Sequence, residues 1–187
     1  MPFLSRGGDV CIAFILKCGC RSISQWVHNY SVRQELTNEE ALKIETRVAF
    51  IRDPIDRLKS VFFDARWSVR IGNNWDNIPN DILLTENRGI QGDWQSFVDY
   101  SLETDNRHWW PQTDLIAHNG QLVPNVYHKL KDIKQYYHLY FKEGSLPHTG
   151  AAARVEQPEY NYRVDDLNEK YKADIELFNS IDGTLRT

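Results

Sequence analysis

The chain has 187 residues, of which 41% are hydrophobic and 26% charged, and its net charge is −4. These values are typical of one globular domain, and they exclude the strongly basic surface that binds nucleic acid. No apolar run approaches membrane-spanning length, and strand-like sequence begins by Val10, so we expect neither a transmembrane segment nor a secretory signal.

The first half of the chain reads as strand, loop and helix, twice over. An apolar run over residues 10–16 predicts a buried strand, and helical spacing from residue 23 predicts a helix with Ser22 as its N-cap. A short helix after Thr37 or Asn38 and a second buried strand over 47–51 follow. Asp53 then caps the next helix, with Pro54 at its first position.

The second half begins with an irregular segment, at about 65–92, that is rich in Asn, Asp, Gly and Pro. A helix is expected from about Asp93, and Asn119-Gly120 predicts a hairpin turn. A helix over 131–141, a long loop and a final amphipathic helix from Val164 to Phe178 complete the chain.

Strands that alternate with helices predict an α/β protein of one domain, 1–187, with a central parallel sheet flanked by helices in a P-loop-like, three-layer fold. Ligands of such folds bind at the carboxyl ends of the strands. The strand-to-helix junctions at 17–22 and 52–54 are both basic, so the site is expected there.

The first junction has the composition of an anion-binding loop. Lys17, Gly19 and Ser22 lie between a strand and a helix, where loop amides, a helix N-terminus and an ammonium group can bind a phosphate. The Walker A spacing is absent, because Lys17 precedes the glycine.

That order resembles the 3′-phosphoadenosine-5′-phosphosulfate (PAPS)-dependent sulfotransferases. "LKCGCRSI" is similar to their loop K-x-[AG]-C-T-[NS], with Lys17, Gly19, Cys20 and Ser22 at matching positions. Arg21 stands where the family usually has Thr, and an arginine there can reach a phosphate instead.

A second motif strengthens the resemblance. "FIRDPIDRLKS" is similar to the family's 3′-phosphate motif, [FV]-x-R-[DN]-P-x-x-R-x-x-S, at Arg52, Asp53, Pro54, Arg57 and Ser60. Arg52 would leave the strand at the site, and Ser60 would lie two turns into the helix. Arg57 is open to two interpretations, a motif residue or an exposed helix residue.

Two further stretches extend the resemblance over residues 12–181. "NRHWWPQTDLI" resembles a segment of the carbohydrate sulfotransferases, and "LPHTGAAAR", which contains Arg154, resembles the family's closing loop. The resemblance implies transfer of a sulfuryl group from PAPS to a hydroxyl or amine, with no metal. Lys17 would stabilise the leaving phosphate. It also implies these cofactor-binding residues: Lys17, Cys18, Gly19, Cys20, Arg21, Ser22, Arg52, Ser60 and Arg154.

The catalytic base is expected among the histidines, whose ordinary pKa suits proton removal near neutral pH. His108 is favoured because it heads "HWWPQ", although a histidine packed structurally beside two tryptophans has the same pattern. His148 and His28 are alternatives, and Glu45 is a further one because some family members use a carboxylate.

The acceptor is expected to be a small molecule or glycan, most simply a carbohydrate. Aromatic faces exposed around a cleft suit sugars. Tryptophans in polar stretches are candidates for such a cleft: Trp67, Trp75, Trp94, Trp109 and Trp110. Only about thirty residues separate the two motifs, which is short for the family, so a partner subunit in an oligomer is compatible with the sequence.

Three cysteines, an odd and small number, predict reduced thiols in a cytoplasmic protein. No clustered Cys or His accompanies Cys18 and Cys20 in sequence, so a zinc site is not expected. Two other functions stay open on the residues alone: a P-loop-like nucleotide kinase, and a non-catalytic module that binds a nucleotide or glycan.

Overall fold

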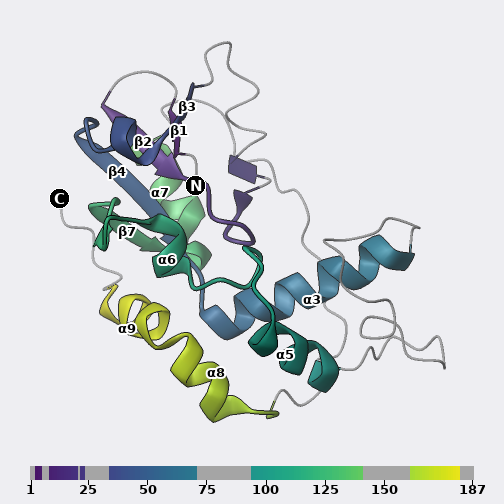
Figure 1. Ribbon diagram of the computed structural model, residues 1–187. Helices are drawn as coiled ribbons and strands as arrows, with labels where there is room; N and C mark the ends of the chain where they lie inside the picture. Colours follow the sequence, from purple (N-terminus) through teal and green to yellow (C-terminus); the bar gives the residue numbers. More distant parts are fainter. Residues whose placement is uncertain are drawn as a thin grey trace.

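The computed structural model describes six stretches of the chain: 3–5, 9–20, 22–23, 34–70, 94–140 and 161–181, with the backbone alone at 34, 66–70 and 137–138. None of the helices in these stretches combines the length and hydrophobicity that crossing a bilayer requires. The elements, labelled as in Figure 1, are β1 (Phe3–Ser5), β2 (Val10–Ala13), β3 (Gln34–Leu36), α2 (Asn38–Ala41), β4 (Thr46–Ile51), α3 (Pro54–Arg70), α5 (Trp94–Glu103), α6 (Gln112–Ile116), β5 (Ala117–His118), β6 (Gln121–Leu122), β7 (Val126–Lys129), η1 (Leu130–Asp132), α7 (Ile133–Tyr140), α8 (Val164–Lys170) and α9 (Lys172–Ser180).

A five-stranded sheet, ordered β3-β1-β2-β4-β7, forms the centre of the fold. β2, β4 and β7 run parallel, with Ile12 opposite Val48 and Val48 opposite Val126. This confirms the predicted α/β class. β1 and β3 add an antiparallel edge that the sequence pattern does not predict, because strands of three residues are too short to show alternation.

Different helices cover the two faces of the sheet, because successive side chains of β4 point to opposite sides. Val48 and Phe50 pack with Tyr136 of α7 on one face. Ala49 and Ile51 pack on the other face with residues of α6 and α9. In Figure 1, α7 accordingly lies behind the sheet and α9 on the near side.

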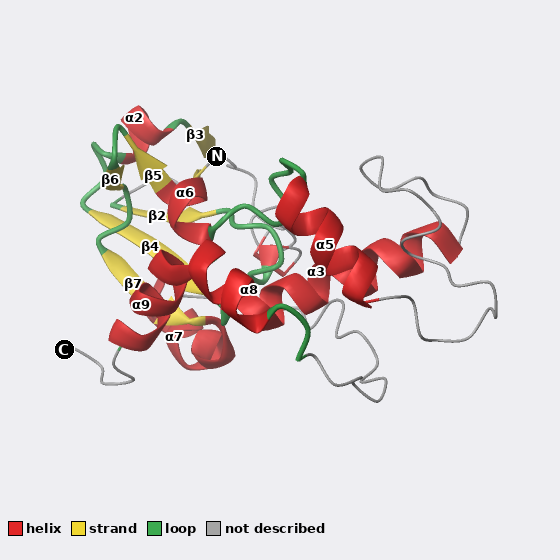
Figure 2. Cartoon of the chain, turned by 60° about the horizontal axis from the view of Figure 1, so that its bottom comes forward, coloured by secondary structure: helices red, strands yellow, loops and turns green. Residues whose placement is uncertain are grey.

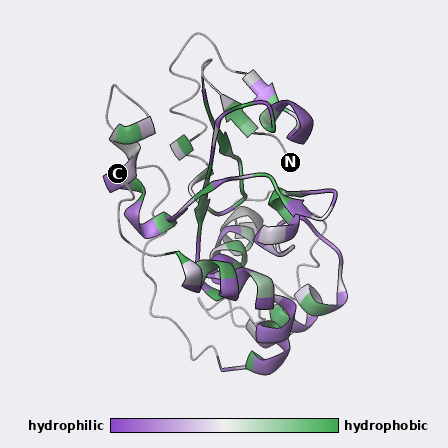
Figure 3. Cartoon of the chain, turned by 90° about the vertical axis from the view of Figure 1, so that its left-hand side faces the viewer, coloured by the Kyte–Doolittle hydropathy of each residue, from purple (hydrophilic) through white to green (hydrophobic). Residues whose placement is uncertain are grey.

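A second hydrophobic cluster lies beyond the sheet, where α3 packs against α5 and α8 (Figure 2). Phe62 of α3 contacts Trp94 and Phe97 of α5, with ring centroids 5.5 and 5.1 Å apart. Trp94 and Trp109 are buried in this cluster, at 4% and 1% exposure, so their predicted place around a cleft is wrong. The three-residue spacing of Trp94 and Phe97 turns both toward α3. Hydrophobic residues follow the strands and the packed sides of the helices (Figure 3).

The predicted caps at Thr37 and Asp53 and the predicted turn at Asn119-Gly120 are confirmed. Thr37 and Glu40 form a reciprocal capping box at α2. The Asp53 carboxylate accepts the Asp56 N–H (2.9 Å) at the start of α3. Asn119 and Gly120, with φ of 51° and 75°, form the turn between β5 and β6.

Three predicted boundaries are wrong. β2 ends at Ala13, because residues 16–19 already form turns. The segment expected to be irregular from about 65 continues α3 to Arg70, and its remainder, 71–92, lies outside the described residues. The single helix predicted at the end of the chain is divided into α8 and α9 at Tyr171, whose backbone (φ −104°, ψ 18°) is not helical. The Tyr171 side chain is buried there, and its hydroxyl donates to the Trp109 carbonyl (2.8 Å).

The buried Asp174 carboxylate fixes α9 to the start of α6. One oxygen accepts the Gln112 N–H (2.7 Å) and the other accepts both the N–H and the hydroxyl of Thr113 (2.8 and 2.9 Å). The carboxylate thus satisfies amides that α6 leaves without partners in its first turn. Segments 60 residues apart in sequence are held together by one side chain.

Replacement of Asp174 by Ala is expected to lower the free energy of unfolding by about 3 kcal/mol, because several buried donors lose their acceptor. Chemical denaturation followed by circular dichroism measures the change. Asp165→Ala, on the exposed first turn of α8, is the control and is expected to change stability little. Equal stability of the two variants would contradict a structural role for Asp174.

Candidate active site

The loop after β2 folds into two tight turns before a helix begins. The Cys18 N–H donates to the Ile15 carbonyl (3.1 Å), and Lys17 and Gly19 take positive φ values of 66° and 77°. The positive φ of Gly19 favours glycine, and a Cβ there would also lie 3.0 Å from a methyl carbon of Leu130, which would have to shift slightly. We call residues 14–19 the β2 loop.

The helix after the β2 loop starts earlier than predicted. The Ile23 N–H donates to the Gly19 carbonyl (3.0 Å), and helical backbone begins at Cys20. Ser22 therefore lies inside the first turn, and its predicted role as N-cap is wrong. Arg21, Arg154, His28 and His148 lie outside the described residues.

Arg52 emerges from the carboxyl end of β4 directly beside the β2 loop. Its Nη1 donates to the Lys17 carbonyl (3.3 Å). Its backbone N–H donates to Gln112 Oε1 (3.0 Å), and its carbonyl accepts from Gln112 Nε2 (2.8 Å). The structure thus brings together the two junctions that the sequence predicts as one site.

Gln112 also reaches the first cysteine of the loop. The Cys18 thiol donates to Gln112 Oε1 (2.9 Å), and both side chains are buried. Burial raises the pKa of the Cys18 thiol to about 11. Cys18 therefore acts as a small, protonated residue within the loop. The pattern "HWWPQ" does not predict these contacts of Gln112, because its partners are distant in sequence.

Arg57 is fully buried, at 1% exposure, which excludes the interpretation as an exposed helix residue. Its Nε donates to the Leu16 carbonyl (3.0 Å) and its Nη1 to the Trp110 carbonyl (2.8 Å). Its Nη2 has no hydrogen-bond partner among the described residues. One guanidinium group therefore joins the β2 loop to the segment that carries His108.

One face of α3 is turned toward the β2 loop. Asp64 forms an ion pair with Lys17, both side chains being largely buried at 18% and 13% exposure. Arg57, Ser60 and Asp64 recur at spacings of three and four, so they share this face. Ser60 therefore lies between two residues that contact the loop. Asp64 was not among the residues predicted for the site, although its four-residue distance from Ser60 places both on one face of a helix.

His108 is buried at 9% exposure, in the segment next to the β2 loop. Its ring Nδ1 lies 3.0 Å from Asn106 Oδ1, which also accepts the His108 backbone N–H (2.9 Å). The structure thus buries most of the surface of this predicted base, two residues before the Trp110 carbonyl that Arg57 binds.

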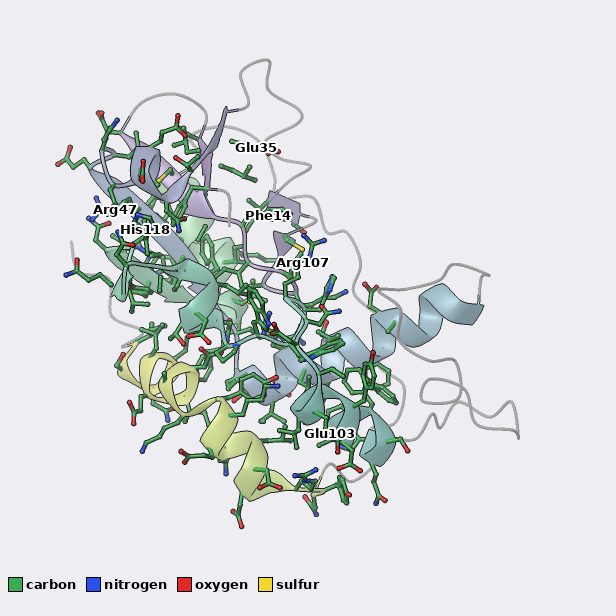
Figure 4. All side chains as sticks on the ribbon, in the orientation of Figure 1. Phe14, Glu35, Arg47, Glu103, Arg107 and His118 are labelled. Atoms are coloured by element: carbon green, nitrogen blue, oxygen red, sulfur yellow. The ribbon has the colours of Figure 1, made fainter. Side chains whose placement is uncertain are left out.

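Glu45 does not reach the site, so its role as an alternative base is wrong. It precedes β4, whereas Arg52 follows that strand, and six residues of strand span roughly 20 Å. In Figure 4, Arg47 lies at the Glu45 end of the sheet and Arg107, the neighbour of His108, lies in the region of Phe14.

Of the five candidate cleft tryptophans, Trp110 is the one that the structure shows exposed, at 39%. Its indole N–H donates to Asp105. The side chains of Trp67 and Trp75 lie outside the described residues. Trp110 thus presents an aromatic face next to the carbonyl that Arg57 binds.

Positive charge accumulates at the carboxyl ends of β2 and β4, where Lys17, Arg52 and Arg57 meet. Within the described stretches, Asp64 on Lys17 is the carboxylate in this cluster, and none lies within ion-pair distance of Arg52 or Arg57. Arg52 is only partly buried and donates to one carbonyl oxygen, whereas the buried Arg57 is solvated by two carbonyl oxygens. The cluster is therefore suited to bind an anionic ligand, with a serine hydroxyl and loop amides beside it.

A strand-to-helix loop that faces a second basic strand end is the arrangement of a P-loop-like α/β protein. A comparison with protein-family models matches residues 17–179 to the sulfotransferase family, so the chain belongs to that family and is a sulfotransferase. A comparison with curated proteins gave no significant match, and neither did one with solved structures.

Alkylation is expected to distinguish the three thiols of the folded protein. Burial raises the pKa of Cys11 and of Cys18 to about 11, so at pH 8 roughly one thiol in a thousand is ionised. Iodoacetamide should modify the half-buried Cys20 first, and Cys11 and Cys18 only after unfolding, as measured by peptide mass mapping. Modification of Cys18 as fast as Cys20 in the folded protein would contradict its burial.

Proposed function

We propose that this sulfotransferase uses PAPS as its sulfuryl donor and a carbohydrate as its acceptor. The observation that carries the choice of donor is the Arg52 guanidinium, which bonds to the Lys17 carbonyl and has no carboxylate partner among the described residues. This contact supports two anion-binding positions side by side, which would suit a nucleotide with phosphate groups at both its 3′ and 5′ positions.

The residues present fit such a donor. Lys17 and the amides of the β2 loop would hold the 5′-phosphosulfate, and Arg52 with Ser60 would hold the 3′-phosphate. Gly19 adopts its positive φ without strain, which allows the loop to turn tightly between Lys17 and the helix that follows. Arg21 and Arg154, outside the described residues, remain assigned to the donor through the motifs alone.

The donor supplies an activated sulfuryl group attached to a phosphate leaving group. The protein makes three contributions to the reaction. Lys17 stabilises the negative charge that develops on that phosphate, and the loop amides hold it in position. His108 accepts the proton of the acceptor hydroxyl or amine.

A carbohydrate acceptor is supported by two features. The segment "NRHWWPQ" resembles that of the carbohydrate sulfotransferases, and its Trp110 exposes an aromatic face of the kind that stacks on sugar rings. A screen of glycans and small hydroxyl compounds with radiolabelled PAPS tests this directly, and sulfation of small phenols alone would contradict it.

The choice of donor is tested with 3′,5′-adenosine bisphosphate, the product that PAPS leaves behind. At a hundred times its Kd, it should stabilise the protein by about 2.7 kcal/mol, whereas ATP with Mg²⁺ should not. Arg52→Ala should remove most of this stabilisation. Stabilisation by ATP alone would contradict the proposed donor.

Lys17→Met should lower sulfuryl transfer by about a hundredfold or more. Lys172→Met, an exposed lysine of α9, is the matched control.

Asp64→Asn is expected to tighten the binding of 3′,5′-adenosine bisphosphate. The donor phosphate competes with the Asp64 carboxylate for the Lys17 ammonium, and an ion pair of about 1 kcal/mol corresponds to roughly fivefold in Kd. Isothermal titration calorimetry measures the change. Asp56→Asn, which removes the Asp56–Lys59 pair from the same helix, is the control. Weaker binding by Asp64→Asn would show that the carboxylate assists the ligand instead.

A further inference from the structure

The side chain of Asn106 determines which nitrogen of His108 carries the proton. Asn106 Oδ1 accepts the backbone N–H of His108 (2.9 Å), and this bond identifies the atom as the amide oxygen, because an NH₂ group could not accept there. The His108 Nδ1 lies 3.0 Å from the same oxygen. An oxygen acceptor requires a donor, so Nδ1 bears the hydrogen and Nε2 of the neutral ring carries the lone pair.

The turn that contains these two residues is fixed from within. The Asn106 carbonyl accepts the N–H groups of both Trp109 and Trp110 (3.0 and 3.1 Å). Trp109 is buried at 1% exposure, and its indole N–H donates to the Thr104 carbonyl (3.0 Å). The imidazole of His108 is thus attached to an anchored segment and has little freedom to turn its ring.

The same turn is fixed to the anion site. Arg57 binds the Trp110 carbonyl and the Leu16 carbonyl with one guanidinium group. Two residues beyond Trp110, Gln112 binds the Cys18 thiol and the backbone of Arg52. A base carried by this turn therefore keeps a constant position relative to the β2 loop and Lys17.

We infer that Asn106 is a positioning residue for sulfuryl transfer, which holds His108 in the tautomer whose Nε2 can take a proton. The inference rests on the proposed role of His108. His108 Nε2 accepts the proton as the acceptor O–H or N–H bond breaks, and a bond forms between the acceptor atom and sulfur. The bond from sulfur to the phosphate oxygen breaks, and its electron pair stays on the phosphate that Lys17 stabilises.

Three variants test the inference. Asn106→Ala removes the oxygen and should lower kcat by about thirtyfold, while the KM for PAPS stays near the wild-type value. Asn106→Asp retains an oxygen acceptor, so its kcat should be close to that of the wild type. Asn125→Ala is the matched control, because Asn125 also bonds two backbone groups, of Glu45 and Arg47, at the opposite end of β4. It should leave kcat unchanged.

A spectroscopic measurement follows the tautomer without any turnover. Long-range ¹H–¹⁵N correlation spectra of the histidine rings, with His108 assigned from His108→Asn, should show the Nδ1–H form in the wild type and in Asn106→Asp. Asn106→Ala should show loss of that preference. A wild-type His108 in the Nε2–H form would overturn the inference, even if Asn106→Ala failed to fold.

The outcomes separate this inference from the function on which it rests. If His108→Ala is inactive but Asn106→Ala keeps full kcat, the positioning role is overturned and the base stands. If His108→Ala keeps full activity, the base itself is wrong and the inference falls with it. In both cases, stabilisation by 3′,5′-adenosine bisphosphate still reports separately on the donor site.

Discussion

The carboxamide of Gln112 is the interaction on which the rest of the site depends. It pairs with the backbone of Arg52 as a neighbouring strand would, and it accepts from the Cys18 thiol at the same time. Asp174 in turn holds the Gln112 backbone N–H. The end of β4, the β2 loop, α6 and α9 therefore form one connected unit. A shift in any of them would move the positive charges apart.

The site balances charge in two different ways. Arg57 is buried, and carbonyl oxygens of Leu16 and Trp110 solvate it in place of a carboxylate. Lys17, in contrast, has Asp64 as a counter-ion. Dipoles fix a cation permanently at modest cost, whereas a carboxylate can be exchanged for an incoming anion. The carbonyl partners of Arg57 are thus permanent parts of the fold. The Asp64 carboxylate, in contrast, can be replaced by a ligand at Lys17, the residue expected to act on that ligand.

The parts of the fold that depend on near neighbours were predictable from the sequence. The Asp53 cap, the Asn119-Gly120 turn and the two basic junctions all follow from local patterns, and the structure confirms that the junctions meet. Gln112 and Asp174 were not predictable, because their partners lie 60 or more residues away and no periodicity records such contacts. Trp109 was misjudged for a related reason: a polar stretch of sequence does not show that α3 and α8 close over it.

The position of Asp174 has a consequence for how the protein is made. The β2 loop is synthesised early, but the carboxylate that secures its support through Gln112 comes more than 150 residues later. A nascent chain can pair β2 with β4 long before α9 leaves the ribosome, yet its β2 loop lacks this support until then. Contacts so distant in sequence also slow folding. Competence to bind the donor should thus be among the last properties that the growing chain acquires.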